Sequence, residues 1–254
     1  MQVLSLEGVD KRFGNGLLAL QGATMSVAAG EFVALLGPSG CGKSTVLRLA
    51  AGLDGISAGR LDAPALRDRS SAQTAFVFQE PTLMPWASVF DNVWLPLRLA
   101  GTGRERAGDR IERALASVGL TDFAGAFPNE LSGGMKMRVS IARALVTEPQ
   151  LLLMDEPFAA LDEITRQKLN ADLLASWQSR QVAALFVTHS VYESVFLSQR
   201  VLVMSARPGR IVAELTIDEP YPRTPAFRTS AAYVRHCAAL TQALEAAHLP
   251  AAAA

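Results

Sequence analysis

The sequence predicts an α/β fold in which a mostly parallel sheet is covered by helices. Three observations lead to this prediction. A glycine-rich loop, Gly37–Thr45, lies between an apolar run and a helix-like segment. Later apolar runs of strand length alternate with segments of helical periodicity, as in βαβ units. No run approaches the roughly 18 consecutive apolar residues that suggest a membrane span, so these runs are interpreted as buried strands.

The N-terminal residues 1–35 are expected to form short strands and turns, an antiparallel β part of the fold. Val3–Leu6 and Gly22–Val27 have β character. The apolar run Phe32–Leu36 follows and leads into the glycine-rich loop, and Thr45–Ala51 is predicted to be the helix after that loop.

The loop has the pattern of a phosphate-binding loop: Gly, four residues, then Gly-Lys-Ser, in a strand–loop–helix context. Its glycines let several backbone N–H groups point into one concavity, and the following helix adds its positive dipole end. Lys43 is expected to reach the β- and γ-phosphates, and the Ser44 hydroxyl to bind Mg²⁺. The alternative is a glycine-rich turn that only enters a helix. The predicted nucleotide-binding residues here are Gly37, Pro38, Ser39, Gly40, Cys41, Gly42, Lys43, Ser44 and Thr45.

The middle of the chain has a helical texture. Ile111, Leu115 and Val118 recur at helical spacing among charged residues, and a second helix is predicted from after Ser132 to Leu145. We therefore expect a helical subdomain over residues 87–148. The core that carries the phosphate-binding loop would comprise residues 1–86 and 149–215, and residues 216–254 would form a C-terminal extension with proline-rich turns and an alanine-rich helix.

After the helical block, strands and helices alternate again. Leu151–Asp155, Leu185–Thr188 and Val201–Met204 are apolar runs that predict buried strands. Apolar residues between Ile164 and Trp177 predict a helix between the first two of these strands. This alternation is the main reason to expect a parallel sheet.

Composition limits the classes of function. The 254 residues include 24 Lys plus Arg and 24 Asp plus Glu, so the formal net charge is zero. That balance argues against a nucleic-acid-binding protein that relies on a broad basic surface. Two cysteines are too few for a disulfide framework, which favours a reducing compartment. Cys41 is interpreted as a small loop residue rather than a redox centre.

An acidic pair ends one of the predicted strands. Asp155 would hold Mg²⁺, directly or through water, at the edge of the sheet. Glu156 follows immediately and would orient or deprotonate an attacking water. An acidic turn at the end of a strand is the alternative, and the phosphate loop upstream favours the catalytic interpretation.

Two further polar residues follow predicted strands. His189 comes after Leu185–Thr188 and would contact the γ-phosphate and align the attack. Gln79 ends the predicted strand Ala75–Phe78, and its amide can bind Mg²⁺ or a water molecule. Alone, either residue would indicate little.

Ser132, Gly133 and Gly134 enter a predicted helix and form a second anion-binding N-terminus. The chain already has one phosphate loop, so this element makes most sense if it serves a nucleotide held by another copy. The sequence therefore predicts a dimer with ATP sandwiched between the subunits. An ordinary helix capped by Ser132 is the alternative.

These motifs together resemble the ATP-binding subunit of an ABC transporter, a P-loop NTPase with a RecA-like core, over nearly the whole chain to about Val212. The resemblance adds an aromatic residue that stacks on adenine, at Phe13. The matching segments are Gly37–Thr45 for Walker A, Gln79 for the Q-loop, Leu131–Met135 for the signature motif, Leu151–Glu156 for Walker B, Ala160, Leu161 and Asp162 for the D-loop at the dimer contact, and His189 for the H-loop.

Finer features resemble the bacterial importers of nitrate, sulfonate, taurine and pyrimidine precursors. They include Phe78–Trp86, Asn92–Leu97 and Val201–Arg210. The chain departs from the family pattern at three positions. Met135 stands where Gln is common, Phe13 replaces the commoner Tyr, and Ser190 replaces the Asp that usually follows the histidine.

The resemblance implies an ATPase that uses ATP and Mg²⁺ to power solute import through a separate membrane permease. It also implies a homodimer or a pair with a homologous subunit, an extracytoplasmic solute-binding protein, and a peripheral location on the cytoplasmic face of the membrane. Exposed apolar residues would dock the permease, the alternative being that they pack the helical insertion; these are Met84, Pro85, Trp86 and Trp94. A soluble ABC-type ATPase acting on DNA or ribosomes and a small-molecule kinase are the competing classes.

Overall fold

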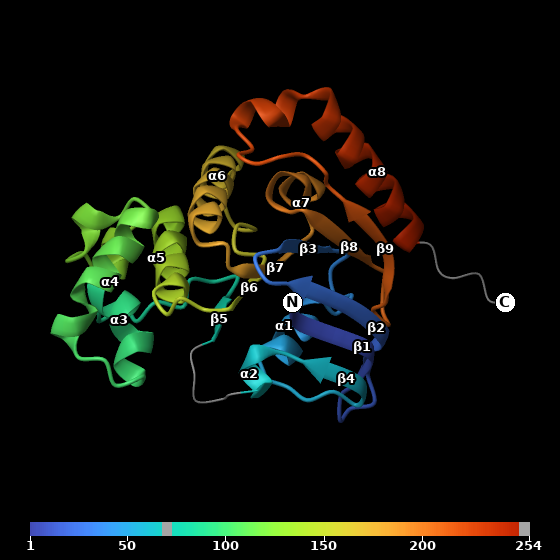
Figure 1. Ribbon diagram of the computed structural model, residues 1–254, viewed down its shortest axis with the longest axis horizontal. Helices are drawn as coiled ribbons and strands as arrows, with labels where there is room; N and C mark the ends of the chain where they lie inside the picture. The colour runs from blue at the N-terminus through green and yellow to red at the C-terminus, as the bar shows by residue number, and fades with distance from the viewer. Residues whose placement is uncertain (68–72, 249–254) are drawn as a thin grey trace.

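The computed structural model describes residues 1–67 and 73–248 as two sheets with helices around them (Figure 1). The larger sheet has six strands in the order β5-β6-β7-β3-β8-β9. All neighbours are parallel except β9, which runs antiparallel to β8. The strands are β3 Phe32–Leu36, β5 Thr74–Val77, β6 Leu151–Asp155, β7 Ala183–Thr188, β8 Arg200–Met204 and β9 Ile211–Thr216. The predicted α/β fold with a mostly parallel sheet is confirmed.

The central strands are buried on both faces, which is why they appear as continuous apolar runs in the sequence. In β3, Phe32 and Leu36 belong to one hydrophobic cluster and Val33 and Leu35 to another. Successive side chains of a strand point to opposite faces, so each strand contributes to both layers of core.

One face of this sheet is covered by α1, Lys43–Ala50, and by the antiparallel sheet. That sheet has the order β2-β1-β4, with β1 Gln2–Arg12, β2 Leu18–Ala28 and β4 Ala58–Asp62. β1 and β2 are longer than predicted, and α1 begins two residues earlier than predicted, at Lys43. The short helix α2, Pro64–Arg67, follows β4.

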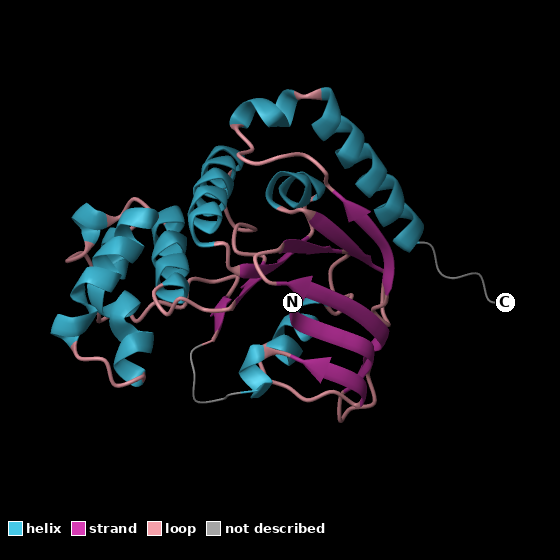
Figure 2. Cartoon of the chain, viewed as in Figure 1, coloured by secondary structure: helices cyan, strands magenta, loops and turns pink. Residues whose placement is uncertain are grey.

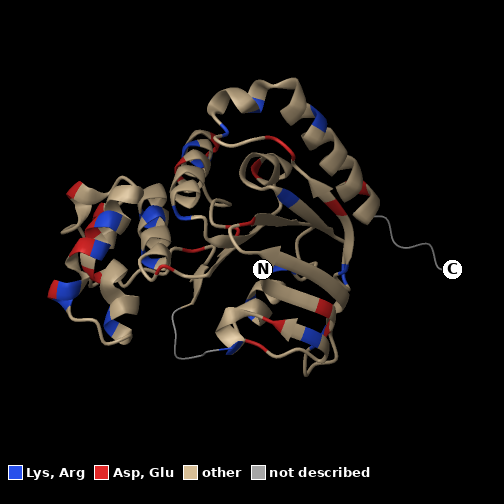
Figure 3. Ribbon diagram, in the orientation of Figure 1, with Lys and Arg blue, Asp and Glu red and all other residues tan. Residues whose placement is uncertain are grey.

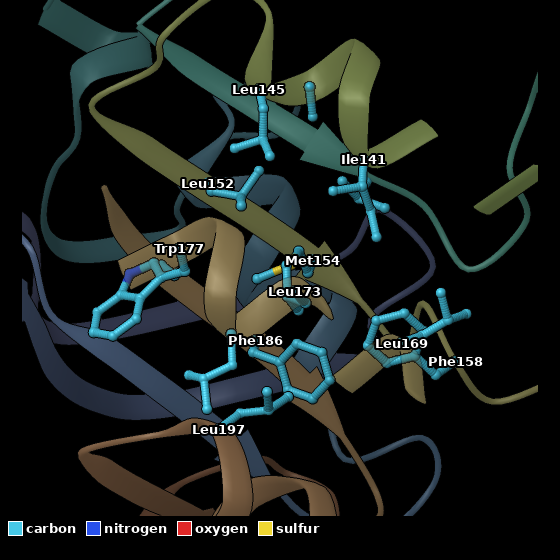
Figure 4. Packing of buried hydrophobic residues seen from close by; sticks show 14 of the residues in the cluster. Ile141, Leu145, Leu152, Met154, Phe158, Leu169, Leu173, Trp177, Phe186 and Leu197 are labelled. Carbon is cyan, nitrogen blue, oxygen red and sulfur yellow. The ribbon is translucent and has the colours of Figure 1, made fainter. Parts of the chain in front are cut away.

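The other face is covered by α5 Gly133–Leu145, α6 Glu163–Arg180 and α7 Val191–Leu197. Figure 4 shows Leu145 of α5 and Leu173 of α6 packing around Leu152 and Met154 of β6. The ring of Phe186 in β7 also lies in this layer. The core of this layer therefore combines apolar helix positions at helical spacing with alternate positions of the central strands.

The middle of the chain is helical, as expected, and lies beside the edge strand β5 (Figures 1 and 2). It contains α3 Val89–Leu99, α4 Arg104–Ser117, the 3₁₀ turns η1 Thr121–Phe123 and η2 Pro128–Glu130, and then α5. Ser88 caps α3 by accepting a hydrogen bond from the Asp91 N–H. α4 carries interspersed charges of both signs (Figure 3). The buried residues of these helices belong to the same hydrophobic cluster as one face of the sheet.

The C-terminal part folds back over α7 and the β8–β9 edge of the sheet (Figure 1). It contains η3 Pro225–Thr229 and the helix α8 Ala231–His248, which matches the alanine-rich helix expected from the sequence. Residues 249–254 of the predicted extension lie outside the described residues. Within the described ranges, no helix is both long and apolar enough to cross a bilayer.

Candidate functional site

The glycine-rich loop joins the buried strand β3 to the N-terminus of α1, as predicted. Gly42 has φ 107°, a backbone conformation that residues other than glycine rarely adopt. A Cβ atom at Gly37 would lie 2.9 Å from Cys41 Sγ and 3.1 Å from the carbonyl oxygen of Met204. Only glycine fits at these two positions, because the loop is packed tightly against its neighbours.

Lys43 is the first residue of α1 and is buried, with only 5 % of the residue exposed. Its Nζ donates hydrogen bonds to the carbonyl oxygens of Gly37 (2.8 Å) and Pro38 (3.0 Å). It also lies 3.5 Å from Glu156 Oε1. The ammonium group is therefore held inside the loop, where phosphate oxygens could replace the carbonyl contacts.

Ser44 and Asp155 meet although they are far apart in the chain. The Ser44 hydroxyl donates a hydrogen bond to Asp155 Oδ1 at 3.1 Å. Burial raises the pKa of Asp155, while the bond from Ser44 and the charge of Lys43 act in the opposite direction. This oxygen pair stands where a cation bound to nucleotide phosphates could be held.

Strand pairing determines where Glu156 and His189 lie. Asp155 pairs with Val187 in the parallel ladder, so the residues just beyond each strand end meet at the same edge. The Glu156 N–H donates to the Val187 carbonyl at 3.0 Å, and Glu156 has φ 44°, uncommon for a residue other than glycine. Its carboxylate Oε2 and the Nδ1 of His189 share a hydrogen bond of 2.9 Å.

Lys43, Ser44, Asp155 and Glu156 line one open cavity of about 370 Å³, whereas His189 contacts Glu156 without being among the lining residues. The lining comes from separate segments of the chain. Leu17 immediately precedes β2, Ala19 lies in β2, Thr45 lies in α1, and Arg207 follows β8. The complete lining is Phe13, Leu17, Ala19, Ser39, Gly40, Gly42, Lys43, Ser44, Thr45, Gln79, Asp155, Glu156 and Arg207. The structure thus brings Phe13 and Gln79 to the phosphate loop, and it adds three residues that the sequence interpretation missed: Leu17, Ala19 and Arg207.

Gln79 differs slightly from its prediction. The strand that precedes it ends at Val77, so Gln79 lies in the connection after the strand and is exposed. Phe78, next to it, stacks on Phe76 with ring centroids 4.4 Å apart.

Ser132, Gly133 and Gly134 do not line this cavity. Ser132 is exposed and caps α5 by accepting a hydrogen bond from the Met135 N–H at 3.3 Å. A Cβ at Gly134 would lie 3.1 Å from Thr165 Cγ2 of α6, so glycine allows the two helix starts to pack closely. A Cβ at Gly133 would lie 3.9 Å from Leu161, which places the predicted signature and D-loop segments side by side.

The remaining D-loop residues precede α6. Ala160 and Asp162 are exposed, and Leu161 is half-buried. Asp162 caps α6 by accepting a hydrogen bond from the Thr165 N–H at 3.0 Å, and this bond lowers the pKa of Asp162.

Two departures from the family pattern have a structural role. Ser190 caps α7 by accepting a hydrogen bond from the Glu193 N–H at 3.3 Å, so it supplies the capping oxygen that an aspartate would also supply. Met135 is half-buried against the hydrophobic core.

Cys41 is buried, and burial raises the pKa of its thiol, which keeps it protonated.

The two tryptophans expected to anchor a partner differ in exposure. Trp86 is 78 % exposed, as predicted. The prediction was wrong for Trp94, which is half-buried and donates an indole hydrogen bond to the Thr102 carbonyl at 3.0 Å. Arg98 lies over its ring, 5.5 Å from the centroid, so Trp94 packs within the helical segment. Pro85 is exposed and Met84 is half-buried.

The comparisons with known proteins identify the family. The family model described as ABC transporter matches residues 20–159. The chain belongs to the ABC transporter family. That range contains the phosphate loop, Gln79, Ser132, Asp155 and Glu156. The prediction of an ABC-type ATPase subunit is thereby confirmed.

Three individual ABC proteins illustrate the similarity. The chain is 48 % identical over 209 residues to the taurine import ATP-binding protein TauB of Rhizobium johnstonii, covering 82 % of this chain and 79 % of TauB. It is 46 % identical over 223 residues to the nitrate import ATP-binding protein NrtD of Synechocystis, covering 87 % and 83 %. The dimeric structure of the ATP-binding cassette MJ0796 bound to ADP and Pi superposes with a TM-score of 0.73 at 30 % identity, covering 85 % of this chain and all of that one.

Proposed function

We propose that this chain binds ATP in the 370 Å³ cavity and hydrolyses it to power solute import through a separate membrane permease. The observation that carries the proposal is the meeting of Lys43, Ser44, Asp155 and Glu156 around one phosphate loop. Phe13 would stack on adenine, while Gly37–Thr45 would enclose the phosphates with backbone N–H groups and with Lys43.

A magnesium ion would be held by Ser44 and Gln79, with Asp155 acting directly or through water. These three oxygen donors suit Mg²⁺, which prefers oxygen ligands. Within the described part of the chain, no cluster of three His, Cys, Asp or Glu side chains could hold a metal alone. The ion would therefore arrive with ATP phosphates, whose charge it neutralises when bound.

Glu156 is the proposed base that orients or deprotonates the attacking water. Its hydrogen bond to His189 and its nearness to Lys43 fix the direction of the carboxylate. His189 would align the γ-phosphate with that water, and Lys43 would offset the charge that develops on the phosphoryl oxygens.

Ser132, Gly133 and Gly134 would close over ATP bound to a second subunit. Two facts support this part of the proposal. The three residues are absent from the lining of their own chain's cavity, and the related cassette MJ0796 is dimeric with ADP and Pi. Ala160, Leu161 and Asp162, which lie beside them, would contribute to the same dimer contact. The partner is a second copy or a homologous subunit.

The transported solute is proposed from relatives. TauB and NrtD are named for taurine and nitrate import, both small anionic or zwitterionic solutes. We propose import of a nitrate-like or sulfonate-like solute, delivered by an extracytoplasmic binding protein. The chain would work on the cytoplasmic face of the membrane, with Trp86 as an exposed anchor for the permease.

Purification of the tagged full chain from detergent-solubilised membranes tests this proposal. An integral membrane permease should co-purify, and the Trp86→Ala variant should capture much less of it. Val234→Ala is the matched control, since Val234 is 60 % exposed on α8, away from the Trp86 segment. Capture of only DNA-bound or ribosomal partners would support the soluble ABC-type ATPase instead.

Stimulation of the complex by taurine or nitrate, measured as phosphate release, would identify the solute.

A further inference from the structure

The turn between β8 and β9, residues 205–210, contributes Arg207 to the wall of the cavity. The turn is braced by its own hydrogen bonds. The Ser205 N–H donates to the Arg210 carbonyl at 2.9 Å, and the Arg210 N–H donates to Ser205 Oγ at 3.1 Å. These hydrogen bonds between Ser205 and Arg210 therefore largely determine the shape of the turn.

The same turn is packed directly on the phosphate loop. A Cβ atom at Gly209 would lie 2.1 Å from the carbonyl oxygen of Cys41, so no other residue fits there. The Gly209 N–H donates to the Ala19 carbonyl at 2.9 Å, and its own carbonyl accepts from the Gln21 N–H at 3.0 Å. The turn thus ties the phosphate loop to β2, which contributes Ala19 to the cavity.

The Arg207 side chain joins this turn to the loop by hydrogen bonds. Its Nε and Nη2 atoms both donate to the carbonyl oxygen of Gly40, at 3.2 and 2.9 Å. Gly40 has φ 75°, so its peptide groups are held in an orientation that few residues would adopt unaided. A carbonyl that turned toward bound phosphates would repel them, because both carry negative charge on oxygen.

We propose that Arg207 is a positioning residue of the nucleotide site: by holding the Gly40 carbonyl, it keeps the phosphate loop in the conformation that binds nucleotide phosphates. This inference rests on the proposed nucleotide site. The planar guanidinium places two N–H donors on one oxygen, whereas lysine can place one and alanine none.

Arg210 provides a matched control in the same turn. Its side chain donates to Gln21 Oε1, away from the cavity lining, and it is exposed like Arg207. Removing Arg210 changes the charge of the turn by the same amount but leaves the Gly40 contact in place.

The experiment is calorimetric titration of the full chain with the Mg²⁺ complex of a non-hydrolysable ATP analogue. Arg207→Ala should weaken binding about fivefold, the effect expected for a partly exposed charged hydrogen-bonding group. Arg207→Lys should recover about half of the loss, and Arg210→Ala should match the wild type. In steady-state hydrolysis, Arg207→Ala should raise KM by the same factor and leave kcat within about twofold.

Three results would overturn the inference. These are wild-type affinity of Arg207→Ala, equal loss in Arg207→Ala and Arg210→Ala, or a loss in kcat alone. Lys43→Ala separates the two levels of the proposal. If Lys43→Ala loses binding and Arg207→Ala does not, only the role of Arg207 fails. If Lys43→Ala also binds normally, the proposed nucleotide site itself is wrong. Should Arg207→Ala not fold, Arg207→Gln keeps a neutral amide donor and is expected to weaken binding about twofold.

Discussion

Glu156 Oε2 lies 2.9 Å from His189 Nδ1, and the other oxygen of the same carboxylate lies 3.5 Å from Lys43 Nζ. The three residues come from the ends of β6 and β7 and from the start of α1. The backbone bond from Glu156 to Val187 holds the carboxylate at the meeting point of these elements. A carboxylate placed between an imidazole and an ammonium group in this way has one fixed direction, toward the cavity.

Glu156→Gln should therefore separate binding from hydrolysis. The amide keeps the size of the side chain but cannot accept a proton from water, so phosphate release should fall by about 10²–10⁴-fold. Affinity for ATP, measured by calorimetry, should be retained. With saturating Mg-ATP, light scattering should show a trapped dimer. Glu112→Gln, on the exposed face of α4, is the control and should hydrolyse ATP normally. A monomeric, fully active Glu156→Gln variant would contradict the assignment.

The separation of Ser132 from its own cavity leads to a subunit-mixing prediction. Lys43→Ala removes the phosphate-binding lysine of a site, and Ser132→Arg obstructs the segment that would cover ATP on the other subunit. Each variant alone should therefore be nearly inactive. In a head-to-tail dimer, a mixed pair combines both lesions in one site and leaves the other intact. Equal mixing should restore about a quarter of wild-type hydrolysis, since about half of the dimers are mixed and each has one working site.

Phosphate release after mixing at high protein concentration is the measurement. Mixing two preparations of the same variant should restore nothing and serves as the control. No recovery, despite mixed dimers that are demonstrated by differently sized tags, would argue against a nucleotide shared between subunits.

Local patterns explain why much of the site could be predicted. The phosphate loop and α1 are contiguous in the chain, so the sequence of Gly37–Thr45 contains its own context. Asp155, Glu156 and His189 each follow an apolar strand, and parallel pairing brings such strand ends together. Arg207 could not be found in this way, because its partner Gly40 lies 167 residues away and a single arginine after a strand has no distinguishing pattern.

Other misses also have physical reasons. β4, Ala58–Asp62, is an edge strand without buried residues, so its sequence lacks an apolar pattern. β9, Ile211–Thr216, alternates only between half-buried and exposed positions. Trp94 was expected at the surface because it was grouped with Trp86 in the segment expected to dock the permease. Large aromatic residues are common anchors at such contacts. The environment of Trp94 depends instead on Arg98, one turn along α3, and on the Thr102 carbonyl and Arg104, which the turn into α4 brings back onto α3.

Glu193 leads to a prediction about stability and pH. It is buried in α7, where the Thr188 hydroxyl donates to its carboxylate, and burial raises its pKa above the ordinary value. The folded state therefore binds the proton more tightly than the unfolded state. At pH values between the pKa of Glu193 in the unfolded chain and its raised pKa in the folded chain, the free energy of unfolding falls as pH rises. At still higher pH, the free energy of unfolding stays at this lower level.

Glu193→Gln removes this proton equilibrium and keeps the oxygen that Thr188 contacts. Relative to wild type, the variant should gain stability on the order of 1 kcal/mol on going from pH 4.5 to pH 7.5. Urea denaturation at several pH values measures the difference. Glu112→Gln should show no comparable pH-dependent gain. A constant difference between Glu193→Gln and wild type at every pH would show that Glu193 titrates normally in the fold.

Arg223 links the C-terminal extension to the end of α7. It is 5 % exposed and donates hydrogen bonds to five backbone carbonyls, and Tyr221 lies against its guanidinium at 4.4 Å. The carbonyls belong to Val195 (2.8 Å), Phe196 (3.3 Å), Ser198 (2.7 Å), Ile217 (3.1 Å) and Glu219 (2.9 Å). Three of them lie at the C-terminal end of α7, where a cation also complements the helix dipole.

Arg223→Ala leaves these buried carbonyls without their donor, so the free energy of unfolding should fall by about 3 kcal/mol. For a chain of this size, such a loss lowers Tm by roughly 6–12 °C. Arg235→Ala, on the exposed surface of α8, should change Tm by less than about 2 °C and controls for loss of charge in the extension. An unchanged Tm for Arg223→Ala would mean that the extension is not fastened to α7 through this residue. Because α7 begins two residues after His189, hydrolysis measured well below Tm then shows whether the extension also influences the sheet edge where Glu156 and His189 meet.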